Sequence, residues 1–217
     1  MQRESSRILF DYWNELRGER QAPERREIEP TRIRMALSNT FILEAADRND
    51  FNFRLAGSHL CSAYCRELKN RSFVNLWQQK DRDAITTLIR AVTDDCAVAL
   101  VTFEGTTSSN NRLAFETILL PLAHNGSTQT RLLGAMSAFD EPYWFGAQPM
   151  MEQKITGLRL IWPDDLKREE FSPKPYEPVF GMVNSGFSGG ISGVPAKVHG
   201  NNARRYQHLA VIDGGRN

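Results

Sequence analysis

Residues 49–77, NDFNFRLAGSHLCSAYCRELKNRSFVNLW, place a strand, a glycine, a short helix and an aromatic-ended loop in one continuous segment. Phe51, Phe53 and Leu55 alternate with other residues, and a period of two is typical of a strand with one buried face. Gly57 then interrupts the strand, and Ser58 is expected to cap the short helix that follows. This order is typical of a small domain that encloses a pocket.

On the N-terminal side, the sequence predicts an amphipathic helix that ends before Gly18. A charged linker separates this helix from the rest of the chain, so its apolar stripe must be buried on the domain or on a partner. Docking within the chain and dimerisation both stay open. The stripe consists of Ile8, Leu9, Tyr12, Trp13 and Leu16.

Strand and helix patterns on either side of this segment predict the rest of the fold. The turn-forming residues 47–50 join predicted strands 40–46 and 51–56 into an antiparallel hairpin. Asp81 is expected to cap a longer helix, which carries Ile85, Leu88, Ile89 and Val92 on one face. Three more strands are predicted, over residues 97–105, 112–122 and 131–139. The order predicts an α+β fold: a five-stranded antiparallel sheet with helices on one face, plus the N-terminal amphipathic helix and a flexible C-terminal tail.

Several motifs now resemble a known family. RLAG (54–57), RELKNRSF (66–73) and NLW (75–77) resemble the bacterial stand-alone PAS family, as do YWNELRGER (12–20) and PTRI (30–33) nearer the N-terminus. The resemblance covers most of residues 7–140, and YQHLAVIDGGR (206–216) adds a shorter match. It implies a PAS fold and a role in signal sensing or protein contact, and it implies no catalytic residue.

Composition predicts one core with extensions. We expect an N-terminal helix and linker (1–29), a PAS domain (30–140), an extension packed on the core (141–170) and a flexible tail (171–217). The tail is rich in proline, glycine, serine and asparagine, and such a composition buries too little apolar surface to offset the entropy of ordering. Within it, residues 206–213 are a docking segment that adds a strand to a sheet edge, or a frayed terminus.

The charge balance argues against several partners. The chain has 27 basic and 26 acidic residues, a net charge of +1, which gives no basis for binding nucleic acid. Arg25 and Arg26 lie in a linker where glutamates interleave, and we interpret it as solvated. No apolar run approaches the roughly 20 residues that span a bilayer, so membrane insertion is not expected. With only three cysteines, a cytoplasmic location is predicted.

Metal and catalytic chemistry finds little support in the residue types. His59, Cys61 and Cys65 are of the kind that binds metals, but the close thiolate pairs of zinc sites are absent. Buried thiols and a hydrogen-bonded histidine are preferred to zinc, redox or haem chemistry. The motifs of hydrolases, kinases and phosphate-binding loops are also absent. We expect no catalytic or metal-binding residue and no enzyme activity. Any cofactor is unknown from the sequence.

Two sets of residues are candidates for function. The first would line a pocket between sheet and helices, although a filled core is the favoured alternative: Phe53, Leu55, Tyr64, Phe73, Trp77, Ile89, Phe103 and Phe115. The second would contact a partner: Leu9, Tyr12, Trp13, Leu16 and Arg54. Arg54 is expected on the opposite sheet face from Phe53, paired with Glu44, Glu104 or a partner.

Two functions from different classes follow. The first is a stand-alone PAS sensory or adaptor module in signal transduction, acting through ligand- or partner-dependent protein contacts. It would work as a homodimer, with a regulatory protein partner, or with a small-molecule ligand. No output domain is expected, so a signal must leave by contact. The alternative is a ligand-free structural domain for protein interaction. A bound species that co-purifies with the protein would favour the sensor.

Overall fold

The computed structural model describes residues 1–47 and 50–162. The chain divides into two units, Met1–Phe171 and Ser172–Asn217. The predicted tail and its segment 206–213 therefore lie outside the described residues. None of the described helices is both long and apolar enough to cross a membrane.

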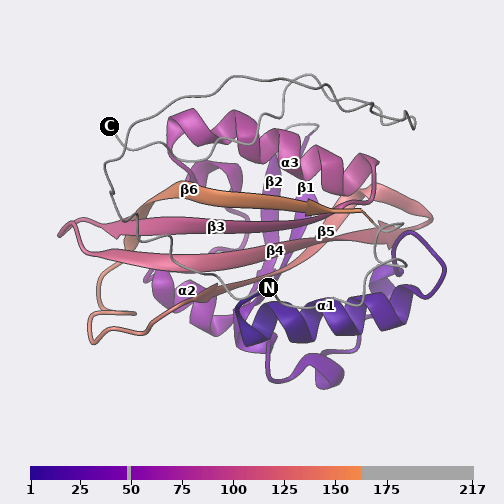
Figure 1. Ribbon diagram of the computed structural model, residues 1–217, viewed down its shortest axis with the longest axis horizontal. Helices are drawn as coiled ribbons and strands as arrows, with labels where there is room; N and C mark the ends of the chain where they lie inside the picture. Colours follow the sequence, from indigo (N-terminus) through magenta and orange to yellow (C-terminus); the bar gives the residue numbers. More distant parts are fainter. Residues whose placement is uncertain (48–49, 163–217) are drawn as a thin grey trace, which may run out of the picture. The chain divides into compact units, whose positions relative to one another are not determined.

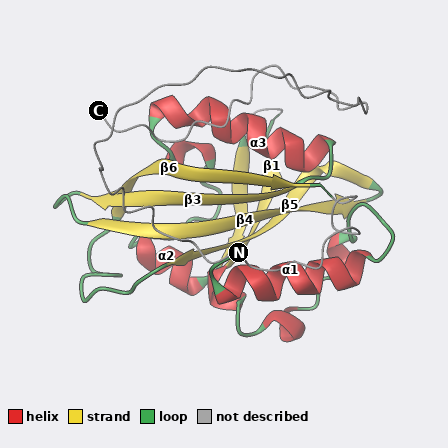
Figure 2. Cartoon of the chain, viewed as in Figure 1, coloured by secondary structure: helices red, strands yellow, loops and turns green. Residues whose placement is uncertain are grey.

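The centre of the first unit is a six-stranded sheet with the order β2-β1-β5-β4-β3-β6, in which every neighbouring pair is antiparallel (Figure 2). The predicted hairpin of β1 and β2 is confirmed. The later strands are each longer than predicted. Their bounds are β1 (Thr40–Ala45), β2 (Phe51–Ala56), β3 (Val98–Thr107), β4 (Arg112–His124), β5 (Ser127–Ala138) and β6 (Met150–Ile161).

The sixth strand corrects the predicted count of five. β6 pairs with the free edge of β3, and its register shifts twice, between Thr102 and Phe103 and between Thr106 and Thr107 of the partner strand. Each bulge turns the following side chains to the other face. The alternation that identifies a strand is therefore interrupted along β6, and only its last residues look strand-like in the sequence. The described part of the extension packs on the core, where Trp144 and Met150 are buried, and it also adds this strand to the sheet.

The helices of the predicted domain lie on one face of the sheet, as expected, and the N-terminal helix lies on the other (Figure 1). The inner face carries α2 (Ser58–Ala63) and α3 (Arg82–Asp94), while α1 (Glu4–Arg17) covers the outer face. The reason is that β4 and β5 turn apolar side chains to both sides, so the outer face also needs cover. Ile118, Leu120 and Leu133 are fully buried beneath α1. Of the two alternatives for the apolar stripe, docking within the chain is the one observed.

Short 3-10 helices fill the connections: η1 (Arg25–Glu27), η2 (Pro30–Ile33), η3 (Leu37–Asn39), η4 (Val74–Leu76) and η5 (Gln79–Asp81). Two predicted caps are not made as expected. Ser58 is the first residue of α2 and Gly57 occupies the cap position. Asp81 does occupy the cap position of α3, but its carboxylate instead accepts a hydrogen bond from the backbone N–H of Ile155 in β6, at 2.9 Å.

Candidate functional site

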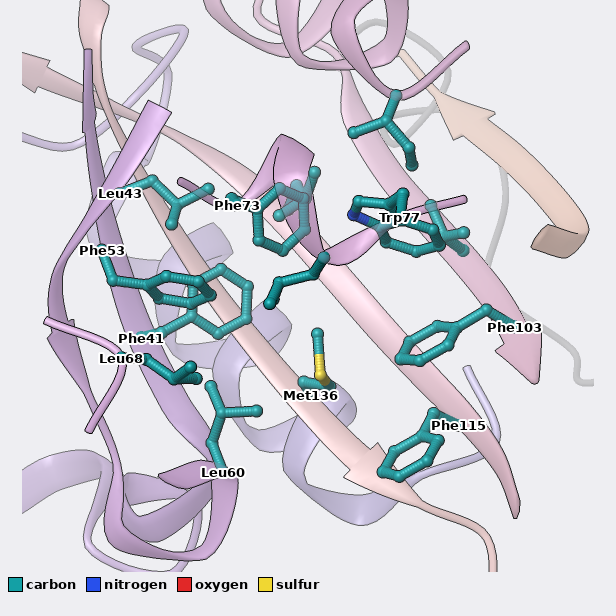
Figure 3. Close-up of a cluster of buried hydrophobic side chains, with 14 of the residues drawn as sticks. Phe41, Leu43, Phe53, Leu60, Leu68, Phe73, Trp77, Phe103, Phe115 and Met136 are labelled. Carbon is teal, nitrogen blue, oxygen red and sulfur yellow. The ribbon is translucent and has the colours of Figure 1, made fainter. Parts of the chain in front are cut away.

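The space between the sheet and the inner-face helices is filled by interlocking rings. Phe53 packs edge-on against Phe73, Phe73 against Trp77, and Trp77 against Phe103, with centroids 5.0–5.8 Å apart. Phe103 stacks on Phe115 at 5.0 Å, and Figure 3 shows these side chains in one continuous cluster. Phe53 also lines the first of the two cavities described below, which lies on the outer face of the sheet. The arrangement favours the filled core over a core pocket.

Seven of the eight candidate pocket residues belong to this buried cluster, and their role in binding a ligand stays a prediction. They are Phe53, Tyr64, Phe73, Trp77, Ile89, Phe103 and Phe115. Burial raises the pKa of the Tyr64 phenol far above its usual value. Its hydroxyl lies 3.7 Å from the sulfur of Met136, a weak acceptor.

Leu55, the eighth candidate, is not in the core. Leu43 pairs with Phe53 and Ile42 with Leu55, so Arg54 is an extra residue in a β-bulge. After the bulge the alternation is reversed, and Leu55 lines the outer face with 43% of its surface exposed. The simple period of two could not reveal this reversal.

The predicted interaction residues of α1 are anchored to their own sheet. Trp13 is fully buried and its indole N–H donates to the carbonyl of Pro121 at 2.8 Å. Leu9 is equally buried, Tyr12 nearly so, and Leu16 is partly buried. Leu9, Tyr12 and Trp13 are therefore not available on the surface of the described unit, whereas Leu16 is partly exposed. Whether they contact a partner after α1 has moved stays a prediction.

Glu116 of β4 holds the start of α1, a role that sequence reasoning missed. Its carboxylate is 99% buried and accepts hydrogen bonds from the backbone N–H groups of Gln2 at 2.8 Å and Arg3 at 3.0 Å. The N–H groups at a helix start lack partners within the helix, and the helix dipole favours a negative charge there. A lone glutamate inside the apolar run of β4 is the sequence signal that could have identified this contact.

The outer face also contains a cavity of about 370 Å³ near the free end of the β1–β2 hairpin, which we call the outer-face cavity. It brings together three elements: the linker after α1, the hairpin, and the loop after α2. Three of its lining side chains are basic and one is acidic. Its lining consists of Arg25, Ile42, Glu44, Ala45, Ala46, Asn52, Phe53, Arg54, Leu55, Lys69 and Asn70.

Glu44 is the single carboxylate of this cavity, and two arginines hold it. Arg54 donates to one of its oxygens at 2.9 Å and Arg131 to the other at 2.8 Å. The expected pairing of Arg54 with Glu44 is confirmed, while Glu104 pairs with Arg112. Burial by itself raises the pKa of Glu44, but the hydrogen bonds and charges of both arginines outweigh it and lower that pKa below its usual value. Glu44 therefore stays ionised at neutral pH.

Arg25 lines the outer-face cavity without a carboxylate of its own. No ion pair joins Arg25 to any acidic residue in the part of the chain that the structure describes. Burial, and then the positive charges of Arg131 and Arg54, lower its pKa. Arg25 also lines a second cavity of about 330 Å³ with Arg26 and the β4–β5 turn.

The interleaved glutamates of the linker do not pair with Arg25, because they have other partners. Glu27 forms an ion pair with Arg20 at 2.9 Å and completes a capping box with Glu24. A Glu24 oxygen accepts the backbone N–H of Gly126 at 3.0 Å. These contacts leave Arg25 facing a basic surface, which the alternation of charges in the sequence could not indicate.

The histidine and cysteines are held by ordinary contacts. His59 lies 2.9 Å from the side-chain oxygen of Asn39 and 3.4 Å from Glu141, which agrees with the preferred hydrogen-bonded histidine. Burial raises the pKa of the Cys61 and Cys96 thiols, which disfavours the reactive thiolate. Among the described residues, no three histidine, cysteine or acidic side chains are grouped so as to hold a metal ion.

Comparison with protein families identifies the class that this fold defines. A family model described as a PAS domain matches residues 1–137, so the chain belongs to the PAS domain family. The resemblance seen in the sequence and the predicted PAS fold are confirmed, with one strand more than expected. PAS domains are generally sensory and not catalytic. No curated protein matches the chain.

The solved structures that match the chain are distant in sequence. The light-state LOV domain of the blue-light photoreceptor Aureochrome1 is 16% identical, with a TM-score of 0.39 over 51% of this chain and 88% of that one. A Rhodobacter sphaeroides LOV protein is 9% identical, with a TM-score of 0.39 over 48% and 60% of the two chains. The PAS domain of an HTR-like protein from Haloarcula marismortui is 14% identical, with a TM-score of 0.37 over 50% and 90%.

Proposed function

We propose that this PAS domain is a sensory or adaptor module in signal transduction, acting through protein contacts that depend on a ligand or a partner. The observation that carries the proposal is the position of Arg25. It lies in the linker that leads from α1, and it lines a cavity on the sheet face that α1 covers. A ligand or partner group in that cavity would contact the linker directly.

Contacts between the linker and α1 would transmit a ligand-dependent movement of the linker to the helix. The hydroxyl of Tyr12 lies 3.3 Å from the carbonyl of Glu27 and accepts the backbone N–H of Glu29 at 2.8 Å. The linker in turn is fixed to the end of β4, where the N–H of Ala123 donates to Pro23 at 2.9 Å. A ligand that favours one position of the linker would therefore shift the balance between docked and released α1. The released stripe would be the surface offered to a second copy or a regulatory protein.

The filled inner core favours a second candidate, a ligand-free domain for protein interaction. Its ring cluster fills the space between the sheet and the inner-face helices. Recognition would then use surface features such as Met35 and Tyr143, which are 71% and 96% exposed. For both candidates we propose a reducing bacterial cytoplasm, because the three cysteines are free thiols.

Native mass spectrometry of freshly purified protein, beside a denatured control, separates the two candidates. The sensor predicts a discrete extra mass that is lost on denaturation, or an assembly state that changes when that mass is removed. A chain mass without addition, with the same assembly state before and after dialysis, would favour the ligand-free domain. The measurement reports bound mass and oligomeric state together.

A further inference from the structure

We propose that the outer-face cavity binds a small molecule through a phosphate group. This inference rests on the proposed sensory function and names the chemistry of its ligand. The lining has the side chains that such a group requires: Arg25 from the linker, Arg54 from β2 and Lys69 from the loop after α2. Arg131 does not line the cavity, but it forms an ion pair with Glu44, which does.

The charges around the cavity are not balanced by protein groups. Glu44 is shared by Arg54 and Arg131, and neither Arg25 nor Lys69 forms an ion pair among the described residues. The Nε of Arg131 is buried without a hydrogen-bond partner in the same part of the chain. Like charges held close together are costly unless an anion lies between them. An anionic ligand would remove that repulsion.

A phosphate suits this arrangement better than a carboxylate does. The basic side chains that line the cavity come from three separate segments of the chain. A phosphate monoester has three acceptor oxygens and carries a charge of about −1.5 to −2 at neutral pH, whereas a carboxylate has two coplanar oxygens and a single charge. Guanidinium groups bind phosphate with paired, charge-assisted hydrogen bonds.

The rest of the cavity leaves room for the body of a small molecule. Its volume of about 370 Å³ falls within the range of roughly 300–1,000 Å³ found for ligand pockets. Ile42 and Leu55 supply an apolar wall, and the amide side chains of Asn52 and Asn70 supply further donors and acceptors. Leu55 contributes to this wall only because the bulge at Arg54 turns it outward.

The second cavity is the weaker candidate. It shares Arg25 but has only Arg26 as a further arginine, and its lining includes the carboxylate of Glu24. That carboxylate is bound through the backbone N–H of Gly126 and not by an arginine. Its negative charge is therefore less compensated than that of Glu44, and an anion is less favoured there.

The test is an NMR titration of the full chain with inorganic phosphate at constant ionic strength, with potassium chloride as the ionic control. Arg25→Gln is expected to weaken phosphate binding about ten- to hundredfold, because a hydrogen bond to a charged group is lost. Lys69→Gln changes a more exposed charge and is expected to weaken binding less. Glu44→Gln is expected to strengthen binding, because it removes the only negative charge in the lining.

Arg26→Gln is the matched control, since it removes the same charge from the neighbouring residue, which does not line the outer-face cavity. We expect it to bind phosphate nearly as well as the wild type. Equal weakening by Arg25→Gln and Arg26→Gln would overturn the proposal, as would the absence of phosphate binding. A parallel titration with malonate, a dicarboxylate, would also overturn it if malonate bound and phosphate did not. The opposite effect of Glu44→Gln cannot arise from loss of folding, so the test stays decisive if one arginine variant is unstable.

The two proposals fail in different ways. Absence of phosphate binding, together with another bound mass in native mass spectrometry, would overturn the phosphate site and leave the sensory function. Phosphate binding without any change in α1 would keep the site and contradict the sensory function.

Discussion

Replacing Trp13 with alanine is expected to lower the free energy of unfolding by about 3–5 kcal/mol, the range found for large aromatic residues removed from a core. The side chain is fully buried between α1 and the sheet and is hydrogen-bonded to the carbonyl of Pro121. The variant loses this packing and leaves that carbonyl without its partner. Urea denaturation followed by circular dichroism measures the loss.

Phe10→Ala is the control for this prediction, because Phe10 is an aromatic residue of the same helix that is only partly buried. Its ring centroid lies 6.2 Å from that of Trp13. We expect a clearly smaller loss. Equal effects of the two substitutions, or a wild-type stability that rises with protein concentration, would indicate that the stripe is buried against a second chain instead of its own sheet.

Gly57→Ala is expected to destabilise the protein by about 1–3 kcal/mol, as an added methyl group does in a tightly packed site. Gly57 joins β2 to α2 with an ordinary backbone conformation, φ −67° and ψ 156°. Gly57 is therefore needed because there is no room for a side chain, and not because of its backbone conformation. A Cβ there would overlap the backbone carbonyl of Ser38 and lie 2.6 Å from that of Leu37. Backbone atoms cannot rotate away as a flexible side chain can. Thermal unfolding followed by circular dichroism checks this expectation.

Ser58→Ala tests the same junction at a residue whose substitution is expected to have little effect on stability. The sequence pattern predicts Ser58 as the helix cap, whereas the structure gives it no capping hydrogen bond. We therefore expect a change within about 0.5 kcal/mol, as at ordinary surface positions. A larger loss for Ser58→Ala than for Gly57→Ala would show that the cap matters more than the close approach of the backbones.

The parts of the fold that could be predicted are those where one pattern dominates. The hairpin of β1 and β2 follows from clean alternation around turn-forming residues, and α3 follows from an apolar stripe with a clear end. The filled core follows from many large rings in a small domain. In each case local periodicity and tertiary packing favour the same answer.

The remaining features depend on bulges and on contacts between distant segments, which the sequence of one segment does not indicate. The bulge at Arg54 moves Leu55 to the outer face, and two bulges hide β6. The use of Asp81 by β6, and of Glu116 by the start of α1, are contacts distant in sequence. The outer-face cavity was missed for the same reason, although two of its lining residues, Arg54 and Leu55, were named as candidates. Among the described residues Arg25 forms no ion pair, because Glu24 and Glu27 are bound elsewhere.

The central claim is that the outer face receives the signal and that the linker carries it to α1. Hydrogen–deuterium exchange of the full chain, with and without saturating inorganic phosphate, tests it most directly. We predict altered exchange in the linker (24–29) and in α1, with unchanged exchange in the core segments 58–64 and 73–77. Unchanged exchange in the linker and α1, or a change confined to those core segments, would contradict the claim.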